Sequence, residues 1–302
     1  MTDRRLLFVH AHPDDEASKG AGTAAHYLAD GAAVTLVTLT GGEAGEVLNP
    51  NADPVPPEDM AKVRAQELAR AVEIIGFVRA YQLGYVDSGY HEDAADIDGG
   101  AFAKVPVDKS GRRLAAILRR EQPQVVVTYP SDGGYPHPDH IMTHTVTMRA
   151  IELAADPEMR LTDDDQTEPT LGTNETTAPG SIEEPWCVQK VYASVIFPTE
   201  RLKTLYEALV EEQREGSFIN YLQERMRRRP GVDPDARVEC GAFFSVRDDA
   251  LRAHVTQVDP TGQWFEVPRG LERARYPYEA YVRLVSRVEA PLPESDLFAG
   301  IE

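Results

Sequence analysis

Histidine and aspartate recur together at two places in this chain of 302 residues, in stretches that otherwise have the composition of loops. Residues 10–16 read HAHPDDE and residues 132–140 read DGGYPHPDH. Each copy of His-Pro-Asp has a further Asp or His beside it. A single copy could be a rigid turn whose Asp caps a helix. Two copies brought together would instead supply the nitrogen and oxygen ligands of a metal ion.

Two imidazoles and one carboxylate are the ligand set of a catalytic zinc site, which keeps a fourth position for water. His12 and Asp15 are three residues apart and can face the same side as a helix begins, and Pro13 makes the turn between them rigid. His140 is the natural third ligand from the second motif. Because Mg2+ and Ca2+ prefer oxygen ligands, we expect Zn2+. The sequence leaves open whether Fe2+ replaces zinc in the cell.

The remaining polar residues of the motifs suggest metal-assisted hydrolysis. Asp14 cannot easily share a metal with Asp15, so it is left beside the bound water as a general base. His137 or Tyr135 could stabilise an oxyanion, and a protonated His137 could deliver a proton to a leaving amine. Asp139 could hold that imidazole in the required tautomer.

The other histidines carry weaker signals. His144 follows His140 by one helical turn, but a zincin pair would need Glu where Ile141 stands, so we assign His144 to the helix interior or to groups behind the ligands. His10 is expected to face the sheet. Three histidines have no accompanying motif and are interpreted as ordinary residues: His26, His91 and His254.

Apolar patterning predicts alternating strands and helices. Strands are predicted at 6–9, 33–40, 80–89, 124–129, 190–197 and 237–244, and helices at 16–31, 57–76, 110–122, 139–155, 199–214 and 245–257. This alternation is typical of an α/β fold with a mostly parallel, twisted sheet and helices on both faces. If the strand order is 3-2-1-4, the carboxyl ends of strands 1 and 4 meet and form the active site.

Three segments are expected along the chain. Residues 1–155 would form the metal-binding core. Residues 156–185 are acidic, rich in Thr and Pro and nearly free of aliphatic residues, which predicts a flexible surface insertion. Residues 186–302 would supply strands and helices that complete the same domain and the substrate cleft.

Composition excludes several kinds of partner. A net charge of −19 and a pI near 4.8 argue against nucleic acid and anionic membranes. No apolar run reaches the ~20 residues of a membrane span, and the N-terminal run is too short for a signal peptide. Cys187 and Cys240, without CxxC spacing, are expected to be buried thiols in a reducing cytoplasm. The oligomeric state is not indicated.

At AHPDDE and GGYPHPDH the sequence resembles the LmbE-like/PIG-L superfamily of zinc-dependent N-deacetylases, which includes enzymes of mycothiol metabolism. The stretches TLTGGEAGEVLNP, GYVDSG, VECGAFFSVRDDALRAHVTQVDP and LFAGIE resemble most closely the members that act on mycothiol S-conjugates. The resemblance implies a Rossmann-like sheet, one zinc ion and a small-molecule substrate. The implied reaction cleaves the amide between an N-acetylcysteine S-conjugate, a mercapturic acid, and glucosaminyl-inositol, in thiol-dependent detoxification. The alternative is deacetylation of N-acetylglucosaminyl-inositol in mycothiol biosynthesis.

The resemblance also implies roles for individual residues. The zinc ligands match His12, Asp15 and His140, the general base matches Asp14, and the groups that assist the tetrahedral intermediate match Tyr135 and His137, with Asp139 as the partner of His137. Arg64 and Asp87 match positions that hold the inositol-sugar, and Glu46 lies in a matching loop nearby. Lys19 matches the amidases, whereas the sister deacetylases have a small polar residue there. It would reach the cysteinyl portion of the substrate, unless it is simply a solvated helix lysine.

Two readings from other classes remain. Paired acids after a first strand also mark Mg2+-binding, receiver-like modules, although these are about half this length and need no histidines. A zinc-stabilised structural domain would have four protein ligands and would unfold on chelation.

Overall fold

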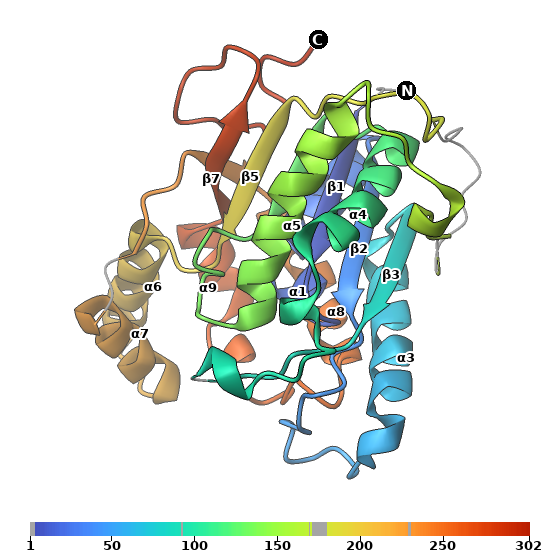
Figure 1. Cartoon of the computed structure of the whole chain (residues 1–302). Coiled ribbons are helices and arrows are strands. Elements are labelled where there is room, and N and C mark those ends of the chain that lie inside the picture. Colours follow the sequence, from blue (N-terminus) through green and yellow to red (C-terminus); the bar gives the residue numbers. More distant parts are fainter. Residues whose placement is uncertain (1–3, 92, 169, 171–179, 229–230) are drawn as a thin grey trace.

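A seven-stranded sheet with helices on both faces forms the centre of the computed structural model, which describes residues 4–91, 93–168, 170, 180–228 and 231–302 (Figure 1). The strands are β1 (Arg5–His10), β2 (Ala33–Thr40), β3 (Arg79–Tyr85), β4 (Val125–Thr128), β5 (Lys190–Val195), β6 (Ala236–Glu239) and β7 (Tyr278–Ser286). The helices are α1 (Asp15–Ser18), α2 (Ala21–Ala29), α3 (Pro57–Ile75), α4 (Val107–Glu121), α5 (Pro138–Ala155), α6 (Thr199–Glu211), α7 (Ser217–Arg228), α8 (Phe244–Ala253) and α9 (Arg269–Arg275). The predicted α/β class is confirmed.

The strand order is β3-β2-β1-β4-β5-β7-β6, so the predicted order 3-2-1-4 is also confirmed. Strands β1 to β5 pair in parallel, and β7 runs antiparallel to both β5 and β6. Leu6 of β1 lies opposite Val125 of β4, and the two strands end at His10 and Thr128. Both His-Pro-Asp motifs therefore leave the sheet at the same edge.

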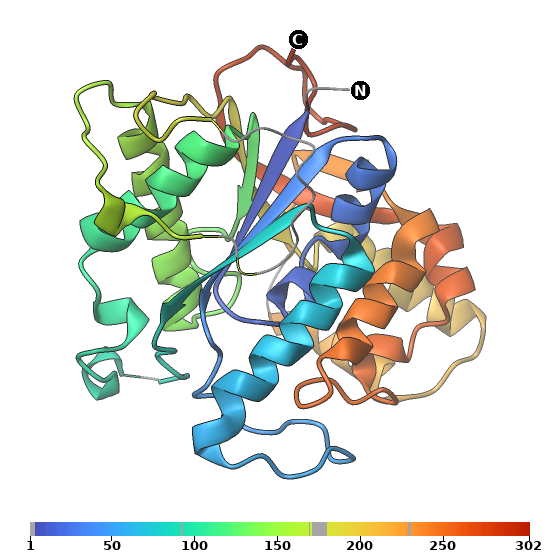
Figure 2. The ribbon, with the colours of Figure 1, turned by 90° about the vertical axis from the view of Figure 1, so that its right-hand side faces the viewer.

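Strand β1 is buried on both faces, which explains its unbroken apolar run. Leu6 and Phe8 pack into one core with α2, α3 and α8, whereas Leu7 and Val9 pack into a second core with α4 and α5. Figure 2 shows the sheet between these two helical layers. A third apolar cluster joins α6, α7 and α9.

The predicted helix 16–31 is interrupted, and the reason is Gly20. Its φ of 125° lies in a region that favours glycine, and a Cβ there would approach the Phe8 ring to 2.5 Å. The chain therefore forms two helices, α1 and α2. This break leaves α1 as a single short turn that positions the residues of the first motif.

The C-terminal part differs more from the prediction. The prediction of a strand at 237–244 is wrong beyond Glu239, where β6 ends. Gly241–Phe243 is a 3-10 turn, and α8 begins at Phe244. The predicted helix 245–257 therefore begins one residue earlier, and it ends at Ala253. Strand β7 and helices α7 and α9 were not predicted.

The expected burial of both cysteines is only half right. Cys240 is buried, but Cys187 is exposed. In the segment before β5, it is Trp186 that packs against the core, and its indole Nε1–H donates to the Pro123 carbonyl at 2.8 Å. The thiol next to it is left at the surface.

Arginines of α4 hold the described residues of the 156–185 segment. Arg119 is buried and donates to the carbonyl oxygens of Asp156 and Ile182, and Arg112 pairs with Asp165 at 2.6 Å. Gly180 donates its N–H to the Arg120 carbonyl at the end of α4, which lies at the amino edge of the sheet, opposite to the motifs. Residues 169 and 171–179 of the expected flexible insertion lie outside the described residues.

Within the described ranges, no helix combines the length and apolar character needed to cross a membrane.

Candidate metal centre and active site

The short loop between β1 and α1 brings His12 and Asp15 together, and the first turn of α5 adds His140. One carboxylate oxygen of Asp15, Oδ2, lies 3.5 Å from His12 Nδ1 and 3.5 Å from His140 Nε2. The three side chains are buried, and their ligand atoms all lie within 4.8 Å of one another. The structure thus gathers the three predicted ligands at one point.

The spacing of these atoms fits one metal ion. Ligands bound tetrahedrally to zinc at about 2.0–2.1 Å lie about 3.3 Å apart, close to the distances found. His140 Nδ1 lies 3.1 Å from the Gly133 carbonyl, which can only accept, so the proton is on Nδ1 and the lone pair is on Nε2. That buried Nε2 has no hydrogen-bond partner among the described residues, a costly state that a cation would relieve.

Gly133 allows this contact. Its φ is 74°, and a Cβ there would lie 2.8 Å from the Cβ of His140 and 2.7 Å from the Tyr135 carbonyl oxygen. Only glycine fits this close approach of loop and helix.

Asp15 remains charged because the Lys19 ammonium and several hydrogen-bond donors lie around it. Burial opposes its ionisation, but Lys19 and His140 hold the pKa of Asp15 well below its usual range. Lys19 pairs with Oδ1, while the Tyr129 hydroxyl donates to Oδ2 at 2.6 Å. The carboxylate is therefore ready to bind a cation near neutral pH.

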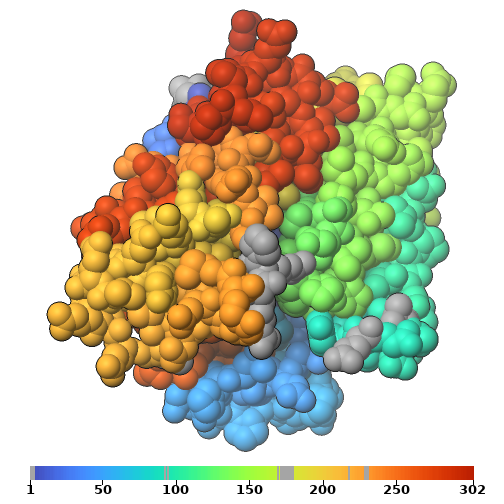
Figure 3. Space-filling model, turned by 90° about the vertical axis from the view of Figure 1, so that its left-hand side faces the viewer, coloured from blue at the N-terminus to red at the C-terminus, as the bar shows by residue number. Residues whose placement is uncertain are grey.

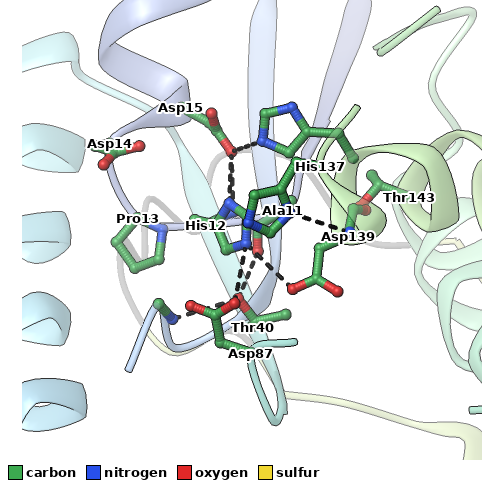
Figure 4. A network of polar contacts seen from close by, with 12 residues as sticks. Ala11, His12, Pro13, Asp14, Asp15, Thr40, Asp87, His137, Asp139 and Thr143 are labelled. Atoms are coloured by element: carbon green, nitrogen blue, oxygen red, sulfur yellow. Dashed lines mark hydrogen bonds and ion pairs between the residues drawn. The ribbon is translucent and has the colours of Figure 1, made fainter. Parts of the chain in front are cut away.

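His12 lies between Asp15 on one side and two carboxylates on the other (Figure 4). Its Nε2 is 3.2 Å from Asp139 Oδ2 and 3.4 Å from Asp87 Oδ1. Since carboxylates accept, the proton belongs on Nε2 and Nδ1 is free for the metal.

The expected partnership of Asp139 with the His137 side chain is corrected. The Asp139 carboxylate accepts from His12 and from the backbone and hydroxyl of Ser88. Its backbone N–H donates to His137 Nδ1 at 3.2 Å, because His137 caps α5. Asp139 thus orients a candidate metal ligand.

His137 is an uncharged hydrogen-bond donor in this arrangement. Because Nδ1 accepts a hydrogen bond, the proton is on Nε2. Burial, together with His12 and His140, lowers the pKa of His137 to about 3. The sequence suggested a protonated His137 as the proton donor to the leaving amine. This charged form of the imidazole is disfavoured near neutral pH.

Asp14 adopts an unusual backbone conformation. Its φ of 103° is left-handed, which costs a residue other than glycine about 1–3 kcal/mol. The backbone N–H donates to Glu16 Oε2 at 3.0 Å, and Arg64 Nη2 donates to Asp14 Oδ2 at 2.8 Å. Burial raises the pKa of Asp14 although Arg64 opposes the shift. A partly exposed carboxylate of raised pKa suits proton transfer.

A cleft of about 390 Å³ lies over these groups. Its walls include the predicted residues His12, Asp14, Asp15, Lys19, Arg64, Asp87, Tyr135 and His137. An apolar part is formed by Leu48, Ile196, Phe197, Leu251, Val258 and Trp264. Figure 3 shows the face where the blue, green and gold parts of the chain meet.

Three predicted substrate-binding residues differ in their surroundings. Lys19 is not a solvated lysine, since it pairs with Asp15 and only 11% of its side chain is exposed. Arg64 is buried, with Nη1 donating to the Gly42 carbonyl at 3.0 Å. Glu46 is exposed, and the structure does not place it on the cleft wall; its carbonyl accepts from Gln257 at 3.0 Å.

Sequence reasoning assigned no partner to His254, and the structure pairs it with a residue of the first motif. It is fully buried, and its Nε2 lies 2.5 Å from Glu16 Oε1. Burial alone would lower the pKa of His254, but Glu16 and Asp14 raise it. No motif surrounds His254; the signal available was Glu16, the last residue of HAHPDDE.

The other assigned histidines lie away from the metal group. His144 Nδ1 is 2.8 Å from the Tyr129 carbonyl, on the side of α5 that packs on β4. His10 is buried between the rings of Phe8 and Tyr129, and burial lowers its pKa to about 4.

Comparison with known proteins identifies the family of this chain. The family model PIG-L, GlcNAc-PI de-N-acetylase, matches residues 7–151, and the chain belongs to this family of amide hydrolases. It is 42% identical to the mycothiol S-conjugate amidase of Streptomyces coelicolor, over 100% of this chain and 99% of that protein. It is 36% identical to the 1D-myo-inositol 2-acetamido-2-deoxy-alpha-D-glucopyranoside deacetylase of Streptomyces avermitilis, over 100% and 98% of the two chains.

A solved structure shares the fold at lower identity. The 4-carboxy-2-hydroxymuconate hydratase GalB of Pseudomonas putida KT2440 matches with a TM-score of 0.60 and 18% identity, over 96% of this chain and 99% of that one.

The metal group predicts the outcome of ligand removal. In His12→Ala or His140→Ala, affinity for Zn2+ should fall by more than about 100-fold, because loss of an outer partner alone costs ~10–100-fold. Metal analysis after equilibrium dialysis measures this. His144→Ala, on the same helix but turned to Tyr129, should keep one ion per chain. Full metal content in His140→Ala would exclude His140 as a ligand.

Proposed function

We propose that this enzyme hydrolyses the amide of mycothiol S-conjugates, releasing an N-acetylcysteine S-conjugate and glucosaminyl-inositol, with Zn2+ held by His12, Asp15 and His140. The main support is the full-length likeness to the S. coelicolor amidase, which exceeds the likeness to the deacetylase. Lys19, which stands at a position where the amidases also have Lys, lines the cleft beside Asp15.

The chain's own residues divide the chemistry among them. A bound zinc ion supplies a water of lowered pKa and polarises the scissile carbonyl. Asp14 accepts the proton of the attacking water. The oxyanion accepts hydrogen bonds from His137 Nε2–H and from the Tyr135 hydroxyl. Asp14 then returns the proton to the leaving amine, because the low pKa of His137 keeps its imidazole uncharged, and a neutral imidazole is a poor acid.

The substrate would lie along the cleft according to the polarity of its parts. Arg64 and Asp87 line the cleft with charged groups suited to the hydroxyls of the inositol-sugar, and the loop that carries Glu46 lies next to them. Lys19 would contact the cysteinyl portion. Asp139 acts through His12, whose ring it orients.

Deacetylation of N-acetylglucosaminyl-inositol is the second candidate, since a full-length relative carries that name. Both reactions release the same amine. The deciding experiment compares kcat/KM for a bimane conjugate of mycothiol and for N-acetylglucosaminyl-inositol, with bound metal quantified in each sample. We expect at least about a tenfold preference for the conjugate, equivalent to ~1.4 kcal/mol. A preference for the acetylated sugar would overturn the proposal.

Removal of the general base should separate turnover from metal binding. In Asp14→Ala, kcat should fall by about 100- to 10,000-fold, the usual contribution of acid–base catalysis, while one zinc per chain remains. Asp14→Asn, which keeps the shape but accepts no proton, should behave alike. If Asp14→Asn kept near wild-type turnover, another group would have to be the base.

Lys19 should decide between the two substrates. Lys19→Ser should lower kcat/KM for the conjugate by about 10- to 100-fold, the value of a charge-assisted hydrogen bond, and should affect the acetylated sugar much less. Lys19→Arg, which keeps the charge, is the matched control. Equal losses on both substrates would mean that Lys19 acts only through Asp15.

A further inference from the structure

A buried acid–imidazole pair connects the first motif to the segment that follows α8. The side chains of Glu16 and His254 are both fully buried, with His254 Nε2 2.5 Å from Glu16 Oε1. The other oxygen, Glu16 Oε2, accepts the backbone N–H of Asp14 at 3.0 Å. One carboxylate therefore connects the backbone of Asp14 to a side chain from the far end of the sequence.

The backbone of Asp14 needs such a contact. At φ 103° this residue is outside its preferred conformations, so the contacts around it must hold it in the left-handed region. Arg64 contacts the side chain and the Pro13 carbonyl, but it does not bind the Asp14 N–H. Arg64 thus holds the carbonyl of the Pro13–Asp14 peptide, and Glu16 holds its N–H.

His254 is itself firmly placed. Two residues on, the N–H and hydroxyl of Thr256 donate to Glu67 at 2.7 and 2.8 Å. The Thr256 carbonyl accepts from the backbone of Leu48 at 2.8 Å. The pair is thus anchored to α3 and to the loop after β2, while neither Glu16 nor His254 lines the cleft.

We propose that Glu16 and His254 are positioning residues, which hold Asp14 in the left-handed conformation that aims its carboxylate at the attacking water. Neither residue touches the substrate. The inference rests on the proposed role of Asp14 as proton acceptor, and it adds that this role depends on a contact from the C-terminal part of the chain.

The test is a double-mutant cycle on the zinc-loaded enzyme. Glu16→Ala should lower kcat by about 10- to 100-fold, the effect of misplacing a reacting group by ~1 Å, with KM and zinc content unchanged. Glu16→Gln should recover most of the loss, since its amide oxygen can still accept the Asp14 N–H. In the Asp14→Ala background, Glu16→Ala should cause no further loss, because there is no carboxylate left to position.

Glu121→Gln is the matched control, since it weakens the contacts of another buried carboxylate, with Arg79 and Tyr81, at the opposite edge of the sheet from Asp14; its kcat should stay within about twofold of wild type. If Glu16→Ala does not fold, His254→Gln replaces it in the same cycle. The inference would be overturned if Glu16→Ala or His254→Gln left kcat unchanged. It would also be overturned if either change lowered kcat as much in the Asp14→Ala background as in the wild type. Neither result would contradict the proposed function. Full turnover in Asp14→Ala would instead overturn the base assignment in the proposed function.

Discussion

The buried carboxylate of Asp15 is the interaction on which the site depends. Its Oδ2 faces both imidazoles and accepts from Tyr129 and from the His12 backbone, while Oδ1 pairs with Lys19. These contacts require that the ends of β1 and β4 be neighbours, because Asp15 follows one strand and His140 follows the other. A parallel sheet with its order reversing at β1 meets that requirement, and the crevice at the switch point becomes the cleft.

Charge explains why this arrangement calls for a cation. Asp14 is paired with Arg64 and Asp15 with Lys19, but Asp87 and Asp139 share only His12 as their ion-pair partner within the described residues. Burying that much negative charge is costly unless it is compensated. A divalent ion beside Asp15 would supply this compensation and would also bind the lone pair on His140 Nε2.

The features that could be predicted from the sequence are those that depend on local residue patterns and on the spacing of the motifs. The sequence predicted the three candidate ligands, the strand order around β1, and α3 with its Pro start and Gly end. It could not predict that Asp139 binds His12 instead of the nearby His137, or that His254 pairs with Glu16, because tertiary contacts decide both. The break at Gly20 was missed since the Phe8 ring that excludes a Cβ comes from another element.

Neither the fold nor the metal-binding group can decide between the mycothiol conjugate and the acetylated sugar as substrate. The hydratase GalB has a similar fold, and both candidate reactions hydrolyse an amide of the same sugar amine. The difference lies in the acyl group, an acetyl or a cysteinyl conjugate, which would be read by Lys19 and the apolar wall of Ile196 and Trp264. A cleft that admits a large acyl group rejects a small one only weakly, because a missing apolar group forfeits only ~1–3 kcal/mol. A small acyl pocket would instead exclude the conjugate by overlap. Overlapping activity is therefore the physical expectation for an enzyme built for the larger substrate.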